Sequence, residues 1–474
     1  MTPSALASID IGSTYTKGAL FALEAGAFRL LSRAETPTTA DNLAVGFGRV
    51  REKLGPGGRG PEDFPVYLSS SARGGLKIAA LGLTADLTLS IARMAAYSAG
   101  GKIVRTYSYE LAADEIAGLE ALQPDIILFT GGTDGGNSAV VLRNAELLGR
   151  SSTAAFILYA GNAKVRDRVL ALLDGKAAAA TDNVMPEVGT IQIEPAREVI
   201  RKIFLKRIVD GKGLSTVVRE TGRDPWPTPL AVFELVRRIG ASQPGWSDFG
   251  LVDMGGATTD FYSHTEAFTG GDSVLLRGLH EPLLKRTVEG DLGLRVSAAA
   301  LWESERAYLT SRLAAAGRSI EDFDAYIHRV SAQPESRPEG GAERAYDEMM
   351  AAACVRAAAL RHAGTLSRVY TPQGGFHVQR GKDLRRITRL IGTGGYLSRT
   401  ENAAILLEAC TPRSPVRPRL RACPSPRPDW TVDQHWERYR DEEPAVWRRL
   451  YERHSRLLPG RACNDYLAGL RTSQ

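Results

Sequence analysis

The sequence predicts an α/β protein built from two similar domains, and three observations lead to that prediction. At 474 residues the chain is longer than one hydrophobic core usually supports. Two strand–turn–strand patterns, at residues 6–35 and 249–278, each place an aspartate near the end of their first strand. About 120 and about 140 residues after each pattern comes a short apolar strand that ends in a glycine-rich loop. A pattern given twice favours a duplication.

The first hairpin is predicted from "LASIDIGSTYTKGALFALEAGAFRLLSRAE", in which apolar residues alternate around short glycine breaks. Its turn contains Asp10, Gly12, Ser13 and Thr14, and Lys17 follows on the next strand. A tight turn alone explains these residues, because glycine permits unusual backbone angles and hydroxyls satisfy turn amides. The other interpretation is a phosphate-binding turn.

The second hairpin, "FGLVDMGGATTDFYSHTEAFTGGDSVLLRG", repeats this plan with Asp253-Met-Gly255 in the place of Asp10-Ile-Gly12. The two glycine-rich loops are "DIILFTGGTDGGN" at 125–137 and "RLIGTGGYLS" at 389–398. The glycines of the second loop have an alternative role, which is to let a strand turn into a helix.

Most of the intervening sequence has helical periodicity. Residues 72–100 and 162–175 carry apolar residues three and four apart, and 193–209 form an amphipathic pattern with proline in the first turn. Residues 298–368 are nearly all helical in pattern, which predicts a helical insertion in the second domain.

Composition excludes several classes of function. The chain is 43% hydrophobic and 24% charged, and no apolar run approaches the roughly 18 residues of a membrane span. We therefore expect a cytoplasmic protein with no membrane partner. The four cysteines, Cys354, Cys410, Cys423 and Cys463, contain no CxxC pair, which disfavours a zinc site, a disulfide framework or an iron–sulfur cluster.

The net charge of +6 lies mostly in the tail, where Thr411 and the residues after it hold 13 arginines against 8 acidic residues. Nucleic-acid binding would instead need basic residues interleaved with aromatics across a folded face, so we expect no nucleic-acid partner. The density of proline up to Trp430 argues against a packed element there, and 444–458 has a helical pattern.

Together the two hairpins and the GTGG loop favour a nucleotide site. Turns rich in glycine and hydroxyls offer N–H groups to phosphate oxygens. Asp10 and Asp253 suit a hydrated Mg²⁺, which takes only one or two protein ligands directly. Asp260 could orient or deprotonate a water, and Lys17 could neutralise phosphate charge.

The segments "SIDIGSTYTK", "LVDMGGATTDF" and "LIGTGGYLS" resemble the first phosphate, second phosphate and adenosine motifs of the actin, sugar kinase and large heat-shock chaperone superfamily. That resemblance implies two duplicated ribonuclease H-like, or actin-like ATPase, domains with ATP in the cleft between them. It assigns phosphate binding to residues of both hairpins and adenosine binding to the loop. These residues are Asp10, Gly12, Ser13, Thr14, Lys17, Asp253, Gly255, Gly256, Thr258, Asp260, Gly392, Thr393, Gly394 and Gly395.

A narrower resemblance runs from about Ser8 to about Leu407. "ILFTGGTDGGN", "DNVMPEVGTIQIEPAREVI", "RTVEGDLGLRVSAA" and "GKDLRRITRLIGTGG" resemble the methylaspartate (glutamate) mutase accessory family, called glutamate mutase L or MutL, which is unrelated to mismatch repair. The resemblance implies a partnership with adenosylcobalamin-dependent mutases or aminomutases, which such proteins are thought to protect or reactivate. It also makes Glu194 a candidate for positioning the attacking water, and Glu289 and Asp291 candidate site residues. The alternative role of Glu289 and Asp291 is to cap the start of a helix.

Two other functions remain open at this stage. A small-molecule kinase of the acetate or sugar kinase type would use the same motifs, with Asp260 as the base for a substrate hydroxyl. A nucleotide-gated binding module would bind ATP without turning it over. The expected domains are 1–185, connecting helices 186–245, a second domain 246–410 with its insertion at 298–368, and a tail 411–474 rich in arginine and proline.

Overall fold

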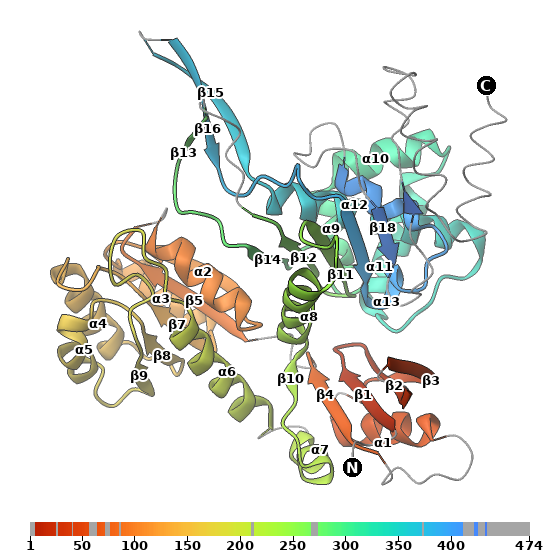
Figure 1. Cartoon of the computed structure of the whole chain (residues 1–474), viewed down its shortest axis with the longest axis horizontal. Coiled ribbons are helices and arrows are strands. Elements are labelled where there is room, and N and C mark those ends of the chain that lie inside the picture. Colours follow the sequence, from red (N-terminus) through yellow and green to blue (C-terminus); the bar gives the residue numbers. More distant parts are fainter. Residues whose placement is uncertain are drawn as a thin grey trace. The chain divides into compact units, whose positions relative to one another are not determined.

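The computed structural model describes eleven stretches of the chain, and the chain divides into two compact units, Met1–Glu234 and Leu235–Gln474. Figure 1 shows the helices and strands of each unit. The described stretches are residues 5–24, 27–39, 41–55, 64–71, 76–84, 87–209, 213–266, 274–371, 374–410, 421–424 and 432–433.

The first unit begins with a mixed five-stranded sheet of order β10-β4-β1-β2-β3. Its strands are β1 (Ala5–Ile11), β2 (Tyr15–Glu24), β3 (Ala27–Pro37), β4 (Val66–Ser70) and β10 (Trp226–Pro227). The first three strands are antiparallel neighbours, whereas β4 runs parallel to β1 and β10 parallel to β4. Alternate residues of β1 are buried, which is the pattern predicted for the first hairpin, and helix α1 (Leu43–Leu54) packs against β2 and β3.

A second sheet of the first unit lies in sequence between β4 and β10, and all its strands are parallel, in the order β6-β5-β7-β8-β9. The strands are β5 (Lys77–Gly82), β6 (Lys102–Ser108), β7 (Ile126–Phe129), β8 (Phe156–Tyr159) and β9 (Ala178–Ala180). Helices α2 (Thr88–Ser98), α3 (Ala113–Leu122), α4 (Ala139–Arg150) and α5 (Arg166–Leu172) connect them. Every residue of β7 is buried, as expected for a parallel strand covered on both faces.

Two predictions fail in this sheet. The prediction of a helix over 72–100 is wrong at its start, because residues 77–82 form the buried strand β5. The periodicity of a short buried apolar run does not distinguish a strand from a helix. The pairing of the loops at 125–137 and 389–398 is also wrong. The first follows β7 in the all-parallel sheet, whereas the second follows β17 (Arg389–Thr393), which belongs to the sheet of the second hairpin.

Three helices complete the first unit and lead into the second. They are α6 (Glu194–Val209), α7 (Leu214–Thr221) and α8 (Thr228–Ser242), and the division between the units falls within α8. That point lies inside the segment 186–245, for which connecting helices are predicted.

The second unit contains a mixed sheet of order β14-β12-β11-β17-β18-β19. Its strands are β11 (Phe249–Met254), β12 (Thr259–His264), β14 (Leu284–Glu289), β17, β18 (Arg421–Pro424) and β19 (Val432–Asp433). Strand β18 runs parallel to β17, so the prediction that no packed element occurs before Trp430 is wrong. Its register is set by backbone pairing with β17, which proline at the strand's last residue tolerates. The predicted helix at 444–458 lies outside the described residues.

Helices form most of the core of the second unit. They are α9 (Ala298–Ser304), α10 (Arg306–Ala315), α11 (Ile320–Ala332), α12 (Gly340–His362) and the short α13 (Gly394–Leu397). The alanine-rich second half of α12 is almost fully buried, because small side chains on a strong helix former allow close packing against its neighbours. The predicted helical insertion at 298–368 is present, but its last residues belong to a strand.

That strand is part of a three-stranded sheet of order β13-β16-β15, which we call the β-arm. Its strands are β13 (Val274–Leu276), β15 (Thr365–Thr371) and β16 (Gly374–Arg380). Figure 1 shows the β-arm as a long ribbon extending away from the six-stranded sheet of its own unit.

The two mixed sheets share one strand arrangement. In each, a hairpin with an antiparallel third strand (β1-β2-β3 or β11-β12-β14) is extended on its other side by two parallel strands (β4 and β10, or β17 and β18). The protein is therefore α/β with mixed sheets. Among the described helices, none combines the length and the apolarity that crossing a membrane requires.

Candidate functional site

The first hairpin turns through a short backbone bridge. The N–H of Gly12 donates to the carbonyl of Tyr15 at 3.1 Å. Thr38, beyond β3, ties the turn from behind: its N–H donates to the carbonyl of Thr14 at 2.9 Å, and its hydroxyl donates to the carbonyl of Gly12 at 2.9 Å. Within the described residues, the N–H groups of Ser13 and Thr14 donate to no protein acceptor. The turn carbonyls are thus occupied and its amides face outward for an anion.

Asp10 is oriented by two hydroxyl groups at the end of β1. The hydroxyls of Ser69 and Thr228 donate to its Oδ1 at 2.7 Å and 2.6 Å. Within the described part of the chain, Oδ2 has no hydrogen-bond partner. Lys17 stands directly opposite Asp10 on β2 and is half-buried. The first turn therefore combines amides, a fixed carboxylate and one lysine, as predicted.

The second hairpin repeats the turn. The N–H of Gly255 donates to the carbonyl of Thr258 at 2.8 Å, three residues on, as in the first turn. The N–H groups of Leu294 and Arg295 donate to the carbonyls of Gly255 and Gly256 at 3.3 Å and 2.9 Å. Among the described residues, the N–H of Gly256 has no protein acceptor.

The segment that ties this second turn, residues 290–297, approaches it very closely. A Cβ on Gly293 would lie 2.6 Å from the carbonyl oxygen of Gly256, so only glycine fits there. The hydroxyl of Ser297 donates to the carbonyl of Ala257 at 2.7 Å. In both hairpins, then, a neighbouring segment binds turn carbonyls, and the amides of Ser13, Thr14 and Gly256 have no protein acceptor among the described residues.

Asp260 lies opposite Asp253 on neighbouring antiparallel strands, and its side chain is buried. Its Oδ2 accepts hydrogen bonds from Arg286 at 2.7 Å and 3.1 Å and from the Tyr262 hydroxyl at 3.3 Å. Its Oδ1 is buried and has no hydrogen-bond partner within the described residues. Burial raises the pKa of Tyr262 well above its usual value, so the phenol stays protonated and donates.

Two carboxylates facing each other across a sheet repel, and Arg286 supplies the only cation ion-paired with Asp260 among the described residues. A hydrated Mg²⁺ keeps most of its waters, so it fits the half-buried Asp253 better than the buried Oδ1 of Asp260. No group of three or more His, Cys, Asp or Glu side chains in the described part of the chain could hold a metal by itself.

The loop at 392–395 lies beside the second hairpin. Strand β17 runs parallel to β11, which puts Thr393 opposite Asp253. Gly394 has φ = +92°, and a Cβ there would lie 2.0 Å from the carbonyl oxygen of Met254. Gly395 follows in the first turn of α13. The second unit thus brings two of the three predicted motifs together at one end of its sheet.

Glu194 is not brought to the first hairpin by any contact. It begins α6, its side chain is 63% exposed, and its carboxylate pairs with Arg197 at 2.5 Å. Within the described residues it forms no hydrogen bond or ion pair with β1 or β2. Its role in positioning water stays a prediction.

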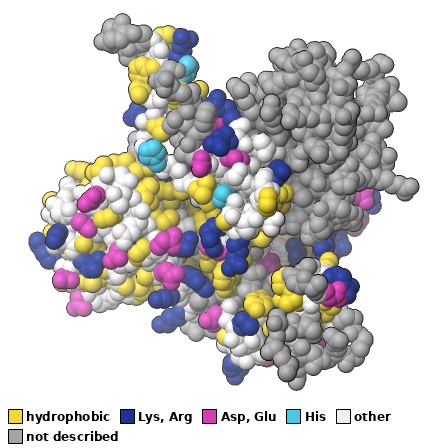
Figure 2. Space-filling model, viewed as in Figure 1, with side chains coloured by type: hydrophobic (Ala, Val, Ile, Leu, Met, Phe, Trp, Pro, Cys, Tyr) yellow, Lys and Arg dark blue, Asp and Glu magenta, His cyan; other side chains and the backbone are white. Residues whose placement is uncertain are grey.

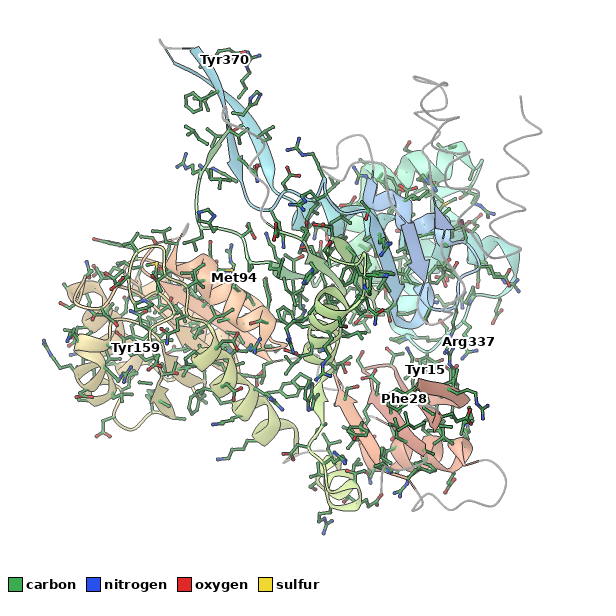
Figure 3. All side chains as sticks on the ribbon, in the orientation of Figure 1. Tyr15, Phe28, Met94, Tyr159, Arg337 and Tyr370 are labelled. Atoms are coloured by element: carbon green, nitrogen blue, oxygen red, sulfur yellow. The ribbon has the colours of Figure 1, made fainter. Side chains whose placement is uncertain are left out.

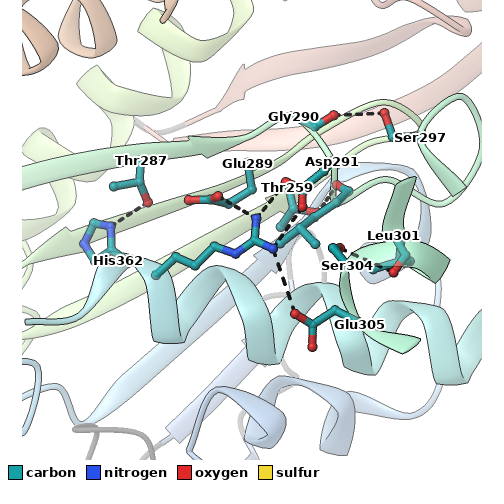
Figure 4. A network of polar contacts seen from close by, with 12 residues as sticks. Thr259, Thr287, Glu289, Gly290, Asp291, Ser297, Leu301, Ser304, Glu305 and His362 are labelled. Atoms are coloured by element: carbon teal, nitrogen blue, oxygen red, sulfur yellow. Dashed lines mark hydrogen bonds and ion pairs between the residues drawn. The ribbon is translucent and has the colours of Figure 1, made fainter. Parts of the chain in front are cut away.

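Glu289 and Asp291 share one arginine, Arg361 of α12 (Figure 4). Arg361 donates to Asp291 at 2.6 Å and 2.9 Å and to Glu289 at 3.0 Å. Burial raises the pKa of Glu289, whereas the bonds and charge of Arg361 outweigh burial and lower the pKa of Asp291. These carboxylates hold the start of the segment that ties the second turn, rather than capping a helix.

Several residues that hold the two turns were not predicted from the sequence. They are Thr38, Ser69, Thr228, Arg286 and Arg361. The double serine at 69–70, after the apolar residues of 64–68, is the local signal that could have indicated Ser69, since a hydroxyl at a strand end can reach a side chain on the neighbouring strand. Arg286 and Arg361 carry no signal, because their partners lie 26 and 70 to 72 residues away.

Comparison with known proteins gives one family and one extended relative. The family model described as MutL protein matches residues 6–436. Protein MutL of Clostridium tetanomorphum is 39% identical over 414 residues, which cover 85% of this chain and 88% of that protein. A 47-residue match at 53% identity joins 10% of this chain to 16% of a phenylalanine-4-hydroxylase of Caulobacter vibrioides, too little of that enzyme to bear on activity.

Among solved structures, a glycerol dehydratase reactivase aligns with this chain at 10% identity and a TM-score of 0.33. The alignment covers 86% of this chain and 95% of the reactivase. A likeness this weak decides neither fold nor function.

Proposed function

Because the chain belongs to the MutL protein family, we propose that it is an ATP-binding accessory protein of an adenosylcobalamin-dependent mutase or aminomutase. In this proposal it binds Mg·ATP, hydrolyses it slowly, and uses the change of nucleotide state to protect or reactivate the mutase.

The observation that carries the nucleotide part of the proposal is the matched pair of turns. In each, the first glycine closes the turn onto a carbonyl three residues on, and a neighbouring segment occupies the turn carbonyls. The amides of Ser13, Thr14 and Gly256 have no protein acceptor among the described residues, and such amides favour phosphate oxygens. If the two turns only reversed the direction of the chain, there would be no need for a neighbouring segment to bind the turn carbonyls in both of them.

The carboxylates support Mg²⁺ as the accompanying ion. Asp10 is held by two hydroxyls with one oxygen left over, and Asp253 lies opposite a second carboxylate. When bound, the ion would neutralise phosphate charge. Lys17 would bind a phosphate oxygen, and the turn amides would orient the phosphate chain.

The shared strand arrangement of the two mixed sheets supports a duplicated fold of the actin-like type. We infer that the parallel sheet between β4 and β10 and the helices α9–α12 are insertions into two copies of one plan. Under this inference β17 is the counterpart of β4, and the loop at 392–395 contacts the adenosine part of the nucleotide.

Coupling to a partner follows from differential affinity. A mutase that binds the ATP state more tightly than the ADP state would be released or remodelled when the γ-phosphate leaves, because only a difference in affinity can shift a conformational equilibrium. Replacement of a damaged cobalamin is one outcome of such a shift.

A kinase of small molecules is less well supported. Its base would have to reach a substrate hydroxyl, but Asp260 is only 4% exposed and is ion-paired with Arg286. The same burial argues that Asp260 acts on water or on Asp253 rather than on an entering metabolite.

Two measurements test the proposal. Calorimetric titration with Mg·ATP should give saturable binding that Asp10→Asn and Asp253→Asn each weaken at least tenfold, while the surface variant Asp41→Asn leaves it unchanged. Recovery of an inactivated mutase of the source organism, in the presence of fresh adenosylcobalamin, should require ATP and the wild-type chain. Binding without recovery would leave a nucleotide-binding protein of another role, and no binding would overturn the site.

A further inference from the structure

The outer strand of the β-arm, β15, is unusual because both of its faces lie in solvent, whereas Phe376, His377 and Val378 of the central strand β16 are half-buried. On β15 every residue from Thr365 to Tyr370 is exposed. Strand alternation and the pairing register put Leu366, Arg368 and Tyr370 on one face, and Val369 with Arg380 on the other. A small sheet gains stability by burying one face, and strand β15 of this sheet buries neither of its faces.

Large apolar side chains are concentrated on this arm. Five of them are exposed, and four of the five are aliphatic: Leu275 (55%), Leu276 (40%), Leu366 (52%), Val369 (37%) and Tyr370 (73%). Figure 2 shows the apolar and basic side chains on the visible face of the arm, and Tyr370 lies toward its far end (Figure 3). These side chains lie on both faces of the arm, and their concentration on one small sheet favours an interaction role.

The charge of the arm is of one sign. Its described residues, 274–280 and 364–380 without 372 and 373, include three arginines and two histidines and no acidic side chain. Arg277, Arg368 and Arg380 form no ion pair with any described residue. The guanidinium of Arg368 lies over the ring of Tyr370, 5.0 Å from its centre. An acidic surface would complement these arginines.

The arm is held firmly at its root. The buried ammonium of Lys382 donates to the carbonyls of Pro282 and Leu283, both at 2.7 Å, and the N–H of Gly364 donates to the carbonyl of Lys382 at 2.7 Å. Just before the arm, His362 is hydrogen-bonded to Ser263 of β12. The root therefore joins the strand that carries Asp260, and the chain leaving it continues into β17 and the loop at 392–395.

We propose that the β-arm is the docking element for the partner protein, which covers both of its faces with a groove that is apolar at its centre and acidic at its rim. The inference rests on the proposed function for the identity of that partner, an adenosylcobalamin-dependent mutase. A nucleic acid fits less well, because four of the five exposed apolar side chains are aliphatic and cannot stack on bases.

The test compares three double variants of the full chain by binding to each purified adenosylcobalamin-dependent mutase of the source organism. The apolar variant is Leu366→Ser with Tyr370→Ser, and the charge variant is Arg368→Glu with Arg380→Glu. The matched control is Ile320→Ser with Arg344→Glu, which alters an exposed apolar and an exposed basic residue on α11 and α12 of the same unit.

We expect the apolar variant to raise the Kd for the mutase at least about tenfold, as loss of a hot spot does. The charge variant should slow association and flatten its dependence on salt, because exposed charges act mainly on the association rate. The control should bind like the wild type. All three variants should bind Mg·ATP and melt as the wild type does, since every altered side chain is exposed.

Equal binding of both arm variants and the wild type would overturn the docking role and leave the accessory function standing. A wild-type chain that binds none of the mutases would overturn the accessory function, and with it the named partner. Conversion of a dimer into a monomer by the arm variants alone, seen by sedimentation, would assign the arm to a second copy of this chain and would also overturn the proposal.

Discussion

Asp10 and Lys17 face each other across the first hairpin, and no described residue forms an ion pair with the lysine. In the second hairpin the same relationship, seven residues apart, joins two carboxylates. The two turns are therefore alike in backbone and opposite in charge. One turn has a lysine beside its aspartate, and the other has a second carboxylate in the corresponding place.

Lys17→Met is expected to weaken ATP binding about tenfold, or about 1.4 kcal/mol, because an ammonium without a protein partner is available to phosphate. Binding of AMP should change much less, since AMP lacks the outer phosphates. Titration calorimetry with both nucleotides checks this. Lys53→Met, which alters a lysine on α1 away from the turn, is the control. Equal losses for ATP and AMP would place Lys17 elsewhere in the site.

Asp260→Asn should destabilise the second unit by about 3 kcal/mol, because it leaves the buried guanidinium of Arg286 without a counter-charge. Chemical denaturation gives the unfolding free energy. Glu408→Gln, which breaks the more exposed pair with Arg312, should cost at most about 1 kcal/mol. A similar small cost for both would mean that Arg286 finds another partner.

Gly394→Ala should destabilise the second unit and abolish nucleotide binding, since its new methyl group would overlap the carbonyl of Met254. Gly340 offers a matched control, because it has a similar φ of +88° but nothing within 4 Å of its would-be Cβ. Gly340→Ala should therefore cost only the backbone strain of roughly 1–2 kcal/mol. Comparable unfolding free energies for the two variants would show that strand β11 can shift away from residue 394.

Acid should destabilise the protein through His362. Burial, together with the charges of Lys285 and Lys382, lowers the pKa of this histidine well below its usual value. Below about pH 6.5 this histidine takes up a proton in the unfolded chain but not in the native protein. The free energy of unfolding therefore falls by up to about 1.4 kcal/mol for each pH unit below that value. Unfolding free energies measured across the window should fall less steeply in His362→Gln.

The exposed His328 provides the comparison. His328→Gln should keep the acid sensitivity of the wild type. If both variants follow the wild-type curve, another group accounts for the loss.

Arg361→Gln should loosen the segment that ties the second turn, because Arg361 binds Asp291 near the start of that segment and Glu289 at the end of β14 just before it. Hydrogen exchange at the amides of Leu294 and Arg295 should accelerate, and Mg·ATP affinity should fall a few fold. Arg356→Gln, on the same helix but paired with Glu305, should leave both readings near the wild type. Unchanged exchange in Arg361→Gln would remove Arg361 from the positioning of the turn.

The sequence was sufficient for the local features of the two hairpins. Alternation around Gly12 and Gly255 predicts the strands, and the aspartates fall where the structure places them, at the ends of β1 and β11. The local pattern works because a hairpin is formed by neighbours in sequence. The roles of Asp10, Asp253 and the other candidate residues in nucleotide binding stay predictions.

Features that depend on distant pairing were missed or misread. Strand β5 resembles a helix in sequence because a buried parallel strand does not alternate between polar and apolar residues. The start of β15 falls in the region predicted to be helical, and because both of its faces are exposed, no buried face imposes a strand pattern on its sequence. Arg286 and Arg361 act on carboxylates brought near by tertiary structure alone. No local pattern could have indicated them.

The hydroxyl of Thr228 reaches Asp10 across 218 residues of sequence, and strand β10 just before it closes the edge of the first sheet. During synthesis the hairpin at the N-terminus can form early. Strand β10, the last strand of its sheet, and the Thr228 hydroxyl that binds Asp10 become available only after the whole parallel sheet has been made. Pairing over such a separation is slow to form. The first unit should therefore complete the surroundings of Asp10 in its last folding step, so that a truncated or stalled chain would carry the sequence motif without the finished turn.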